Sequence, residues 1–177
     1  MLIFGHIAFG DIVSLFLAKI LHISSSSPHY NILLMIGVIA SIIPDLDNFI
    51  LFYKYKSLKL QKDDSHRRYI PHTPLFWIII SVLVYIISPN DLIKYSSFFI
   101  LAGSLSHLVG DSIEYGIVWF WPFSKKQYLI HKIPQENFKE NEPLLSYYWK
   151  FFSQIYIKNW TFYFELIVIL LALISIL

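Results

Sequence analysis

Five long apolar segments constrain the fold of this chain more than any other feature of its sequence. A helix of roughly 20 apolar residues crosses the hydrocarbon core of a bilayer, which is about 30 Å thick, so each segment is long enough, or nearly so, to span a membrane. Only 15% of the 177 residues are charged, against about 25% in soluble domains. The sequence therefore predicts an all-α, polytopic membrane bundle of about five spans. The segments cover approximately residues 2 to 21, 31 to 53, 73 to 88, 96 to 120 and 160 to 177.

We expect a single integral-membrane domain over residues 1 to 177. Residues 1 to 125 form its core, residues 126 to 159 an interfacial segment, and residues 160 to 177 the last span. Tyrosine and tryptophan gather around the interfacial segment, as expected for side chains that settle at the headgroup level. The segment is therefore predicted to lie along the membrane surface.

Lysine and arginine are concentrated in two loops, at residues 54 to 68 and 125 to 158, which hold six each. Basic loops stay on the cytoplasmic side of a membrane. This asymmetry predicts a multi-pass protein of the cell inner (cytoplasmic) membrane with its N-terminus in the cytoplasm. The net charge of +2 is too small to indicate a nucleic-acid partner, and membrane lipids are the expected partners.

Ionisable residues interrupt the apolar segments. Each costs about 2.5 to 3.5 kcal/mol at the centre of a helix on insertion scales, so each needs a reason. The orientation above rests on lysine and arginine alone, yet most of these residues, with His66 and His72 of the first basic loop, fall on the predicted cytoplasmic side. This convergence predicts a common site. The interrupting residues are His6, Asp11, Asp45, Asp47, His107, Asp111, Glu114 and Glu165.

Spacing adds a second constraint. His107 and Asp111 are four residues apart and Glu114 follows three later, so in a helix all three project from one face. In "PDLD" the proline disturbs the helix, and a local break could bring both Asp45 and Asp47 to a metal or leave only one able to ligate. Pro71 biases the residue before it toward an extended conformation, which would return the following histidine over the site.

The residue types point to a metal centre. The chain has no cysteine, so any metal must be held by His, Asp and Glu. Imidazole and carboxylate together suit zinc, manganese or iron, and the number of these residues is sufficient for one or two ions. Two metals can activate water and clamp the oxygens of a phosphoester. Arg67 or Arg68 could bind a phosphate through its planar guanidinium.

Three other interpretations use the same residues. A lone intramembrane His or Asp can be explained as a structural hydrogen bond between helices, and Glu165 and Asp11 are open to that reading. A proton- or metal-coupled transporter also needs such residues, but the outer halves of the segments are largely apolar and no internal repeat is visible. A non-catalytic membrane adaptor could hold a structural metal and dock a partner through its aromatic, basic loop.

Four motifs, "GHIAFG", "IPDLDNF", "HRRYIPHT" and "SLSHLVGDSIEYGIVWFWPF", resemble in order those of the membrane-bound metal-dependent hydrolases, small bacterial and archaeal inner-membrane proteins of the YdjM and YbcI type. The resemblance covers roughly residues 1 to 125 and implies a distant similarity to zinc-dependent phospholipase C. The interval between His66 and His72 is one residue longer than in the family pattern, which leaves open which of the two ligates. The metal set that the resemblance implies is His6, Asp45, Asp47, His66, His72, His107 and Asp111.

Together these features lead to the hypothesis of a metal-dependent hydrolase at the cytoplasmic membrane surface. Its substrate would be a phosphoester, either a phosphorylated lipid or a small molecule. Asp47 or Glu114 would support a ligand or act as the general base that orients the attacking water. Arg67 would bind the phosphate.

Overall fold

The computed structural model describes residues 1–55, 67, 69–131 and 143–176. The predicted all-helical class is confirmed for these residues. Short 3-10 turns, η1 (Ile43–Asp47), η3 (Ile70–His72) and η5 (Tyr156–Lys158), and a π-helical turn, η4 (Phe151–Ile155), join or extend the α-helices. The α-helices are α1 (Ile3–Ile20), α2 (Tyr30–Ala40), α3 (Asn48–Tyr55), α4 (Pro74–Ile86), α5 (Asp91–Glu114), α6 (Leu144–Lys150) and α7 (Trp160–Ile176).

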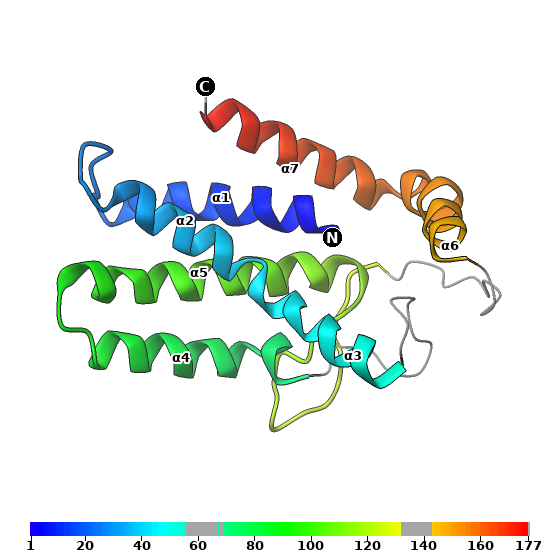
Figure 1. Ribbon diagram of the computed structural model, residues 1–177, viewed down its shortest axis with the longest axis horizontal. Coiled ribbons are helices and arrows are strands. Elements are labelled where there is room, and N and C mark those ends of the chain that lie inside the picture. The colour runs from blue at the N-terminus through cyan, green and yellow to red at the C-terminus, as the bar shows by residue number, and fades with distance from the viewer. Residues whose placement is uncertain (56–66, 68, 132–142, 177) are drawn as a thin grey trace.

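Helix α5 lies at the centre of the bundle. It packs against α1, α2 and α4, and α7 packs against the far side of α1. Figure 1 shows that the loops α1–α2 and α4–α5 lie at one end of the bundle. The first residues of α1, α4 and α7 and the last turn of α5 lie at the other end (Figure 1), and we call this the site end.

Two described helices, α1 and α5, are long and apolar enough to cross a membrane. A third span results if the pair Leu144–Lys158 and Trp160–Ser175, bent by 88°, is counted as one. Helices α2 and α4 are apolar but shorter. Two to three candidate spans thus support the membrane character of the bundle. That the chain has five spans, and that the interfacial segment lies on the cytoplasmic side, stay predictions.

The structure divides the predicted segment 31 to 53 at "SIIPDLD". Helix α2 ends at Ala40, and η1 follows with Pro44 in its first turn. The backbone N–H of Asp45 bonds the carbonyl of Ile42 at 3.0 Å, three residues back, in place of the carbonyl of Ser41 that an α-helix would use. The carbonyl of Ser41 is thereby released for another partner.

Helix α5 begins and ends at recognisable signals. The side chain of Asn90 accepts a hydrogen bond from the backbone N–H of Ile93 at 3.0 Å, as an N-cap residue does. After Glu114 the chain turns at Gly116, which has φ +84°, a conformation that favours glycine. The helix therefore stops before the predicted residue 120, and its last turn carries Asp111 and Glu114 to the site end.

Small residues let α1, α2 and α5 approach closely. A Cβ added to Gly103 of α5 would lie 2.9 Å from the carbonyl carbon of Gly37 of α2. Ser41 donates a hydrogen bond to the carbonyl of His6 at 2.9 Å. Small residues at such contacts are typical of helix packing in membranes, and here they hold the elements that carry the polar residues.

Glu165 joins α7 to the beginning of α1. Its buried carboxylate accepts hydrogen bonds from the backbone N–H groups of Leu2 and Gly5, each at 3.1 Å, and from the hydroxyl of Tyr156. The first N–H groups of a helix have no partner within it, and a negative charge there is favourable. Glu165 therefore fixes both α7 and η5 against the site end.

Replacing Glu165 with alanine should destabilise the protein by several kcal/mol. The change leaves three donors without their acceptor, and each unsatisfied buried donor costs roughly 1 to 3 kcal/mol. Thermal unfolding of the purified protein in detergent measures the effect. Alanine at the neighbouring Leu166, which is 42% exposed, is the matched control, and equal melting temperatures for the two variants would contradict the assignment.

Candidate metal centre

Four side chains from three separate elements meet at the site end: Asp45 from η1, His72 from η3, and His107 and Asp111 from α5. Each offers one ligand atom, and these atoms all lie within 4.8 Å of one another. The two histidines and Asp111 are fully buried, whereas the side chain of Asp45 is 22% exposed. We call this group the four-residue cluster.

The hydrogen bonds of the two histidines determine where their protons lie. Nδ1 of His107 is 2.8 Å from the carbonyl oxygen of Ser41, the carbonyl released by the break after α2. Nδ1 of His72 is 2.9 Å from Oδ2 of Asp47. A carbonyl and a carboxylate only accept hydrogen bonds, so each Nδ1 carries the proton and donates. In the neutral rings both Nε2 atoms then present a lone pair.

The two Nε2 atoms face each other at 3.3 Å. Two lone pairs at this distance repel unless a proton or a metal cation lies between them. Nitrogen ligands about 2.0 to 2.1 Å from a tetrahedral zinc ion are themselves about 3.3 to 3.4 Å apart. The spacing of His72 and His107 therefore fits two ligands of one metal ion.

The carboxylates complete the donor set. Oδ1 of Asp45 is 3.7 Å from Nε2 of each histidine. Oδ2 of Asp111 is 3.9 Å from Nε2 of His72 and 3.8 Å from Nε2 of His107. Two imidazole nitrogens and two carboxylate oxygens around one point suit zinc, with manganese or iron as further possibilities. The residues present thus fit a divalent metal ion.

The carboxylates of the cluster and of Asp47 favour positive charge on the groups beside them. Burial by itself lowers the pKa of His72, but the hydrogen bond to Asp47, the nearby carboxylate of Asp45 and the charges of Asp47 and Asp111 outweigh it and raise the pKa above its ordinary value. A divalent cation would satisfy the same carboxylates.

Asp111 is shared between the cluster and a second set of neighbours. Its Oδ2 accepts a hydrogen bond from Nε of the buried Arg67, whose guanidinium lies 3.8 Å above the ring of Tyr115. Its Oδ1 is 3.3 Å from Nε2 of His6 and 3.4 Å from the amino group of Met1. Burial lowers the pKa of Arg67, but the charges of Asp111, Tyr115 and Asp45 outweigh it and keep the pKa above its usual value.

The remaining predicted site residues surround the cluster. The ring of His6 stacks on that of His107, with 3.9 Å between centroids. Oδ2 of Asp47 accepts the hydrogen bond from Nδ1 of His72, on the side of the ring opposite Nε2. Glu114 is buried beyond Asp111, and its Oε2 lies 3.3 Å from the amino group of Met1. His66 and Arg68 lie outside the described residues, so whether His66 also ligates stays a prediction.

Sequence reasoning missed several contributors, among them the amino group of Met1, Ser41 and Tyr115. The proline of "SIIPDLD" was a usable signal for Ser41, because a helix that breaks at a proline frees carbonyl groups in the preceding turn. Tyr115 carried no signal, since its role depends on the position of Arg67, a residue distant in the chain.

Replacing Asp47 with alanine should weaken metal binding about 10- to 100-fold, the usual effect of losing the outer partner of a ligating histidine. Competition with a fluorescent zinc chelator measures the affinity. Asparagine at the same position keeps an acceptor for Nδ1 of His72 and should retain more affinity than alanine. Alanine at the exposed Asp91, at the other end of α5, is the control, and an Asp47→Ala affinity equal to that control would contradict the assignment.

The family model described as YdjM inner membrane protein matches residues 1–177, so the match extends beyond the motifs of residues 1 to 125. No curated protein and no solved structure matches the chain with significant similarity. The family description states a membrane location and names no reaction.

Proposed function

Since the chain belongs to the YdjM inner membrane protein family, we propose that it is a membrane-embedded, metal-dependent hydrolase of phosphoesters with the four-residue cluster as its metal centre. The observation that carries the proposal is the pair of Nε2 atoms of His72 and His107, 3.3 Å apart, with both Nδ1 protons directed elsewhere. The basic loops support a location of this centre at the cytoplasmic face.

Each residue has a distinct part in the proposed reaction. Asp45, His72, His107 and Asp111 would hold the ion, and Asp47 would orient His72 through its Oδ2. A bound divalent metal supplies Lewis acidity toward a phosphoryl oxygen and lowers the pKa of water. The partly exposed side chain of Asp45 marks the side from which water and substrate approach, because the other three members of the cluster are fully buried.

Hydrolysis also needs a group that accepts the proton of the attacking water. Oδ1 of Asp47 is buried and has no hydrogen-bond partner among the described residues, so it is our candidate for the general base. Glu114 lies beyond Asp111 and is the second candidate. Water adds to phosphorus, the bond from phosphorus to the alcohol oxygen breaks, and the leaving alcohol takes up a proton.

Arg67 contributes positive charge next to the centre. Its Nε donates to Asp111, which fixes the guanidinium beside the cluster. We propose that the guanidinium also attracts the phosphate of the substrate, since its planar set of five N–H donors suits phosphate oxygens.

The proposal is tested on the full chain purified in detergent. Bound metals are measured by elemental analysis, and hydrolysis is followed on bis-p-nitrophenyl phosphate and on vesicles that contain phosphatidic acid or phosphatidylglycerol. We expect the wild-type protein to hydrolyse these substrates, a chelator to abolish the activity, and zinc or manganese to restore it. The Asp111→Asn variant should be inactive. His29→Ala, at the other end of the bundle, is the control.

Either of two results would overturn the proposal, and each would favour a different function. Stoichiometric metal without hydrolysis of any of these substrates would favour an adaptor with a structural metal. Metal transport into vesicles that depends on the same residues would favour a carrier.

A further inference from the structure

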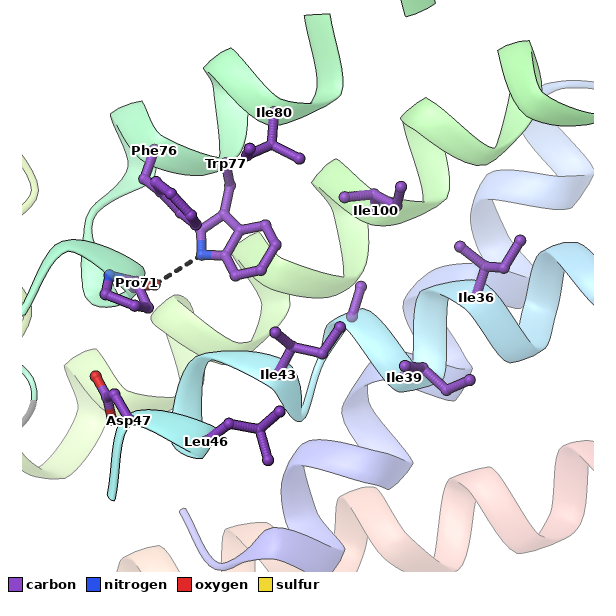
Figure 2. A pocket seen from close by; sticks show the side chains of 11 residues that line it. Ile36, Ile39, Ile43, Leu46, Asp47, Pro71, Phe76, Trp77, Ile80 and Ile100 are labelled. Carbon is purple, nitrogen blue, oxygen red and sulfur yellow. Dashed lines mark hydrogen bonds between the residues drawn. The ribbon is translucent and has the colours of Figure 1, made fainter. Parts of the chain in front are cut away.

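A second feature of the site end is an apolar pocket between α2 and α4, shown in Figure 2. One wall includes Ile36 of α2 and Ile43 and Leu46 of η1, and Trp77 and Ile80 of α4 form part of the opposite wall. Its volume is about 580 Å³, within the range of about 300 to 1,000 Å³ that is usual for small-molecule sites. We call it the α2–α4 pocket.

The pocket adjoins the metal centre. Asp47 is the one charged residue among the described residues that line it, and the same side chain holds His72 of the cluster at 2.9 Å. Pro71, which directly precedes His72, also lines the pocket and accepts a hydrogen bond from Trp77 at 2.7 Å. Figure 2 shows Asp47 and Pro71 at one end of the pocket, with Ile36 and Ile100 toward the other.

The lining restricts what the pocket can hold. Apart from Asp47 it presents aliphatic and aromatic side chains together with a proline, which cannot satisfy the hydrogen bonds of a polar ligand. Ile39, Ile43 and Leu46 line the pocket and are also 50%, 37% and 51% exposed. These exposed side chains bring one wall to the outer surface of the bundle, where a molecule in the bilayer can reach it.

We propose that the α2–α4 pocket binds one hydrocarbon chain of a membrane lipid while the phosphorylated headgroup of that lipid lies at the four-residue cluster. This inference rests on the proposed function and names its substrate class. A pocket that is apolar along its length and ends at Asp47, beside the cluster, matches a molecule with one apolar and one charged end.

The expected contribution of the pocket is positioning. A lipid chain leaves one apolar environment for another when it enters the pocket, so the hydrophobic effect favours the transfer little. The walls instead fix the chain, and a fixed chain places the phosphoester at the metal centre, as an oriented reactant requires. Filling the pocket should therefore impair hydrolysis of lipids more than hydrolysis of water-soluble phosphoesters.

The test uses phosphatidic acid with a photoactivatable diazirine in the middle of its acyl chain, placed in vesicles with the full chain. After illumination, labelled residues are mapped by mass spectrometry in the wild type, in Ile80→Trp, which fills the pocket, and in Ile79→Trp. Ile79 neighbours Ile80 on α4, is 49% exposed and does not line the pocket. Ile36→Trp fills the pocket from the opposite wall and guards against a folding defect in Ile80→Trp, and bound metal reports that either variant retains its fold.

We expect the label to concentrate on pocket residues and to fall several-fold there in Ile80→Trp and Ile36→Trp but not in Ile79→Trp. The ratio of kcat/KM for phosphatidic acid to that for bis-p-nitrophenyl phosphate should fall in the same two variants. Labelling spread evenly over the outward faces of the helices, and unchanged by the two pocket-filling variants, would overturn the inference.

The two proposals fail separately. Pocket labelling without hydrolysis would leave the lipid-chain site in place and remove the hydrolase. Metal-dependent hydrolysis of the soluble ester with diffuse labelling would leave the hydrolase and remove the lipid-chain site.

Discussion

Replacing His107 with alanine should leave the purified protein without its bound metal. The substitution removes a buried imidazole and with it one of the two Nε2 atoms that face each other at 3.3 Å. Loss of an outer partner already weakens metal sites about 10- to 100-fold, so loss of a ligand should have a larger effect. Elemental analysis after gel filtration should change from about one ion per chain to background.

A matched control shows whether the loss of metal is specific to His107 or follows from removing any histidine. His29→Ala removes an exposed histidine in the loop between α1 and α2, at the opposite end of the bundle, and should keep its metal. Metal content that is the same in both variants would refute the four-residue cluster as the metal centre. Asp111→Asn provides an independent test, because the amide keeps the shape of the side chain and removes its charge.

Replacing Arg67 with methionine should destabilise the metal-free protein by about 3 to 5 kcal/mol, the usual cost of removing one partner of a buried ion pair. Asp111 also lies near His6 and the amino group of Met1, which places the expected value at the lower end of that range. A bound divalent cation compensates the same carboxylate. The variant should therefore recover much of the lost stability when zinc is added.

Thermal unfolding in detergent, with a chelator and then with excess zinc, measures both parts of this prediction. Lys125→Met removes an exposed cation and should change the melting temperature little under either condition. A loss for Arg67→Met that is the same with and without zinc would show that Arg67 and the metal do not act on a shared charge.

Regular spacing made part of the site predictable. His107 and Asp111 were placed on one helical face from their four-residue interval, and the structure brings both to the cluster. Arg67 of the first basic loop lies beside Asp111 at the site end, and the cytoplasmic placement of that end stays a prediction. These inferences needed only helical periodicity and the distribution of charge, which act locally along the chain.

The rest depended on contacts that the sequence does not display. Asp45 and Asp47 take different roles because η1 directs one toward the cluster and the other toward Nδ1 of His72. The pairing of Arg67 with Asp111 joins residues 44 positions apart. Helix ends were predictable only approximately, since the stop after Glu114 reflects a turn at Gly116 rather than a change in hydrophobicity.

The origin of the four cluster residues on η1, η3 and α5 has a consequence for biogenesis. Until α4 has docked on α5, His72 is not beside His107 and the donor set is incomplete, so metal can bind only to an assembled bundle. A ligand that binds only the folded state adds stability, about 4 kcal/mol when its free concentration is 1,000 times its dissociation constant. A bound ion would then stabilise only the assembled bundle, so removing it should lower the free energy of unfolding.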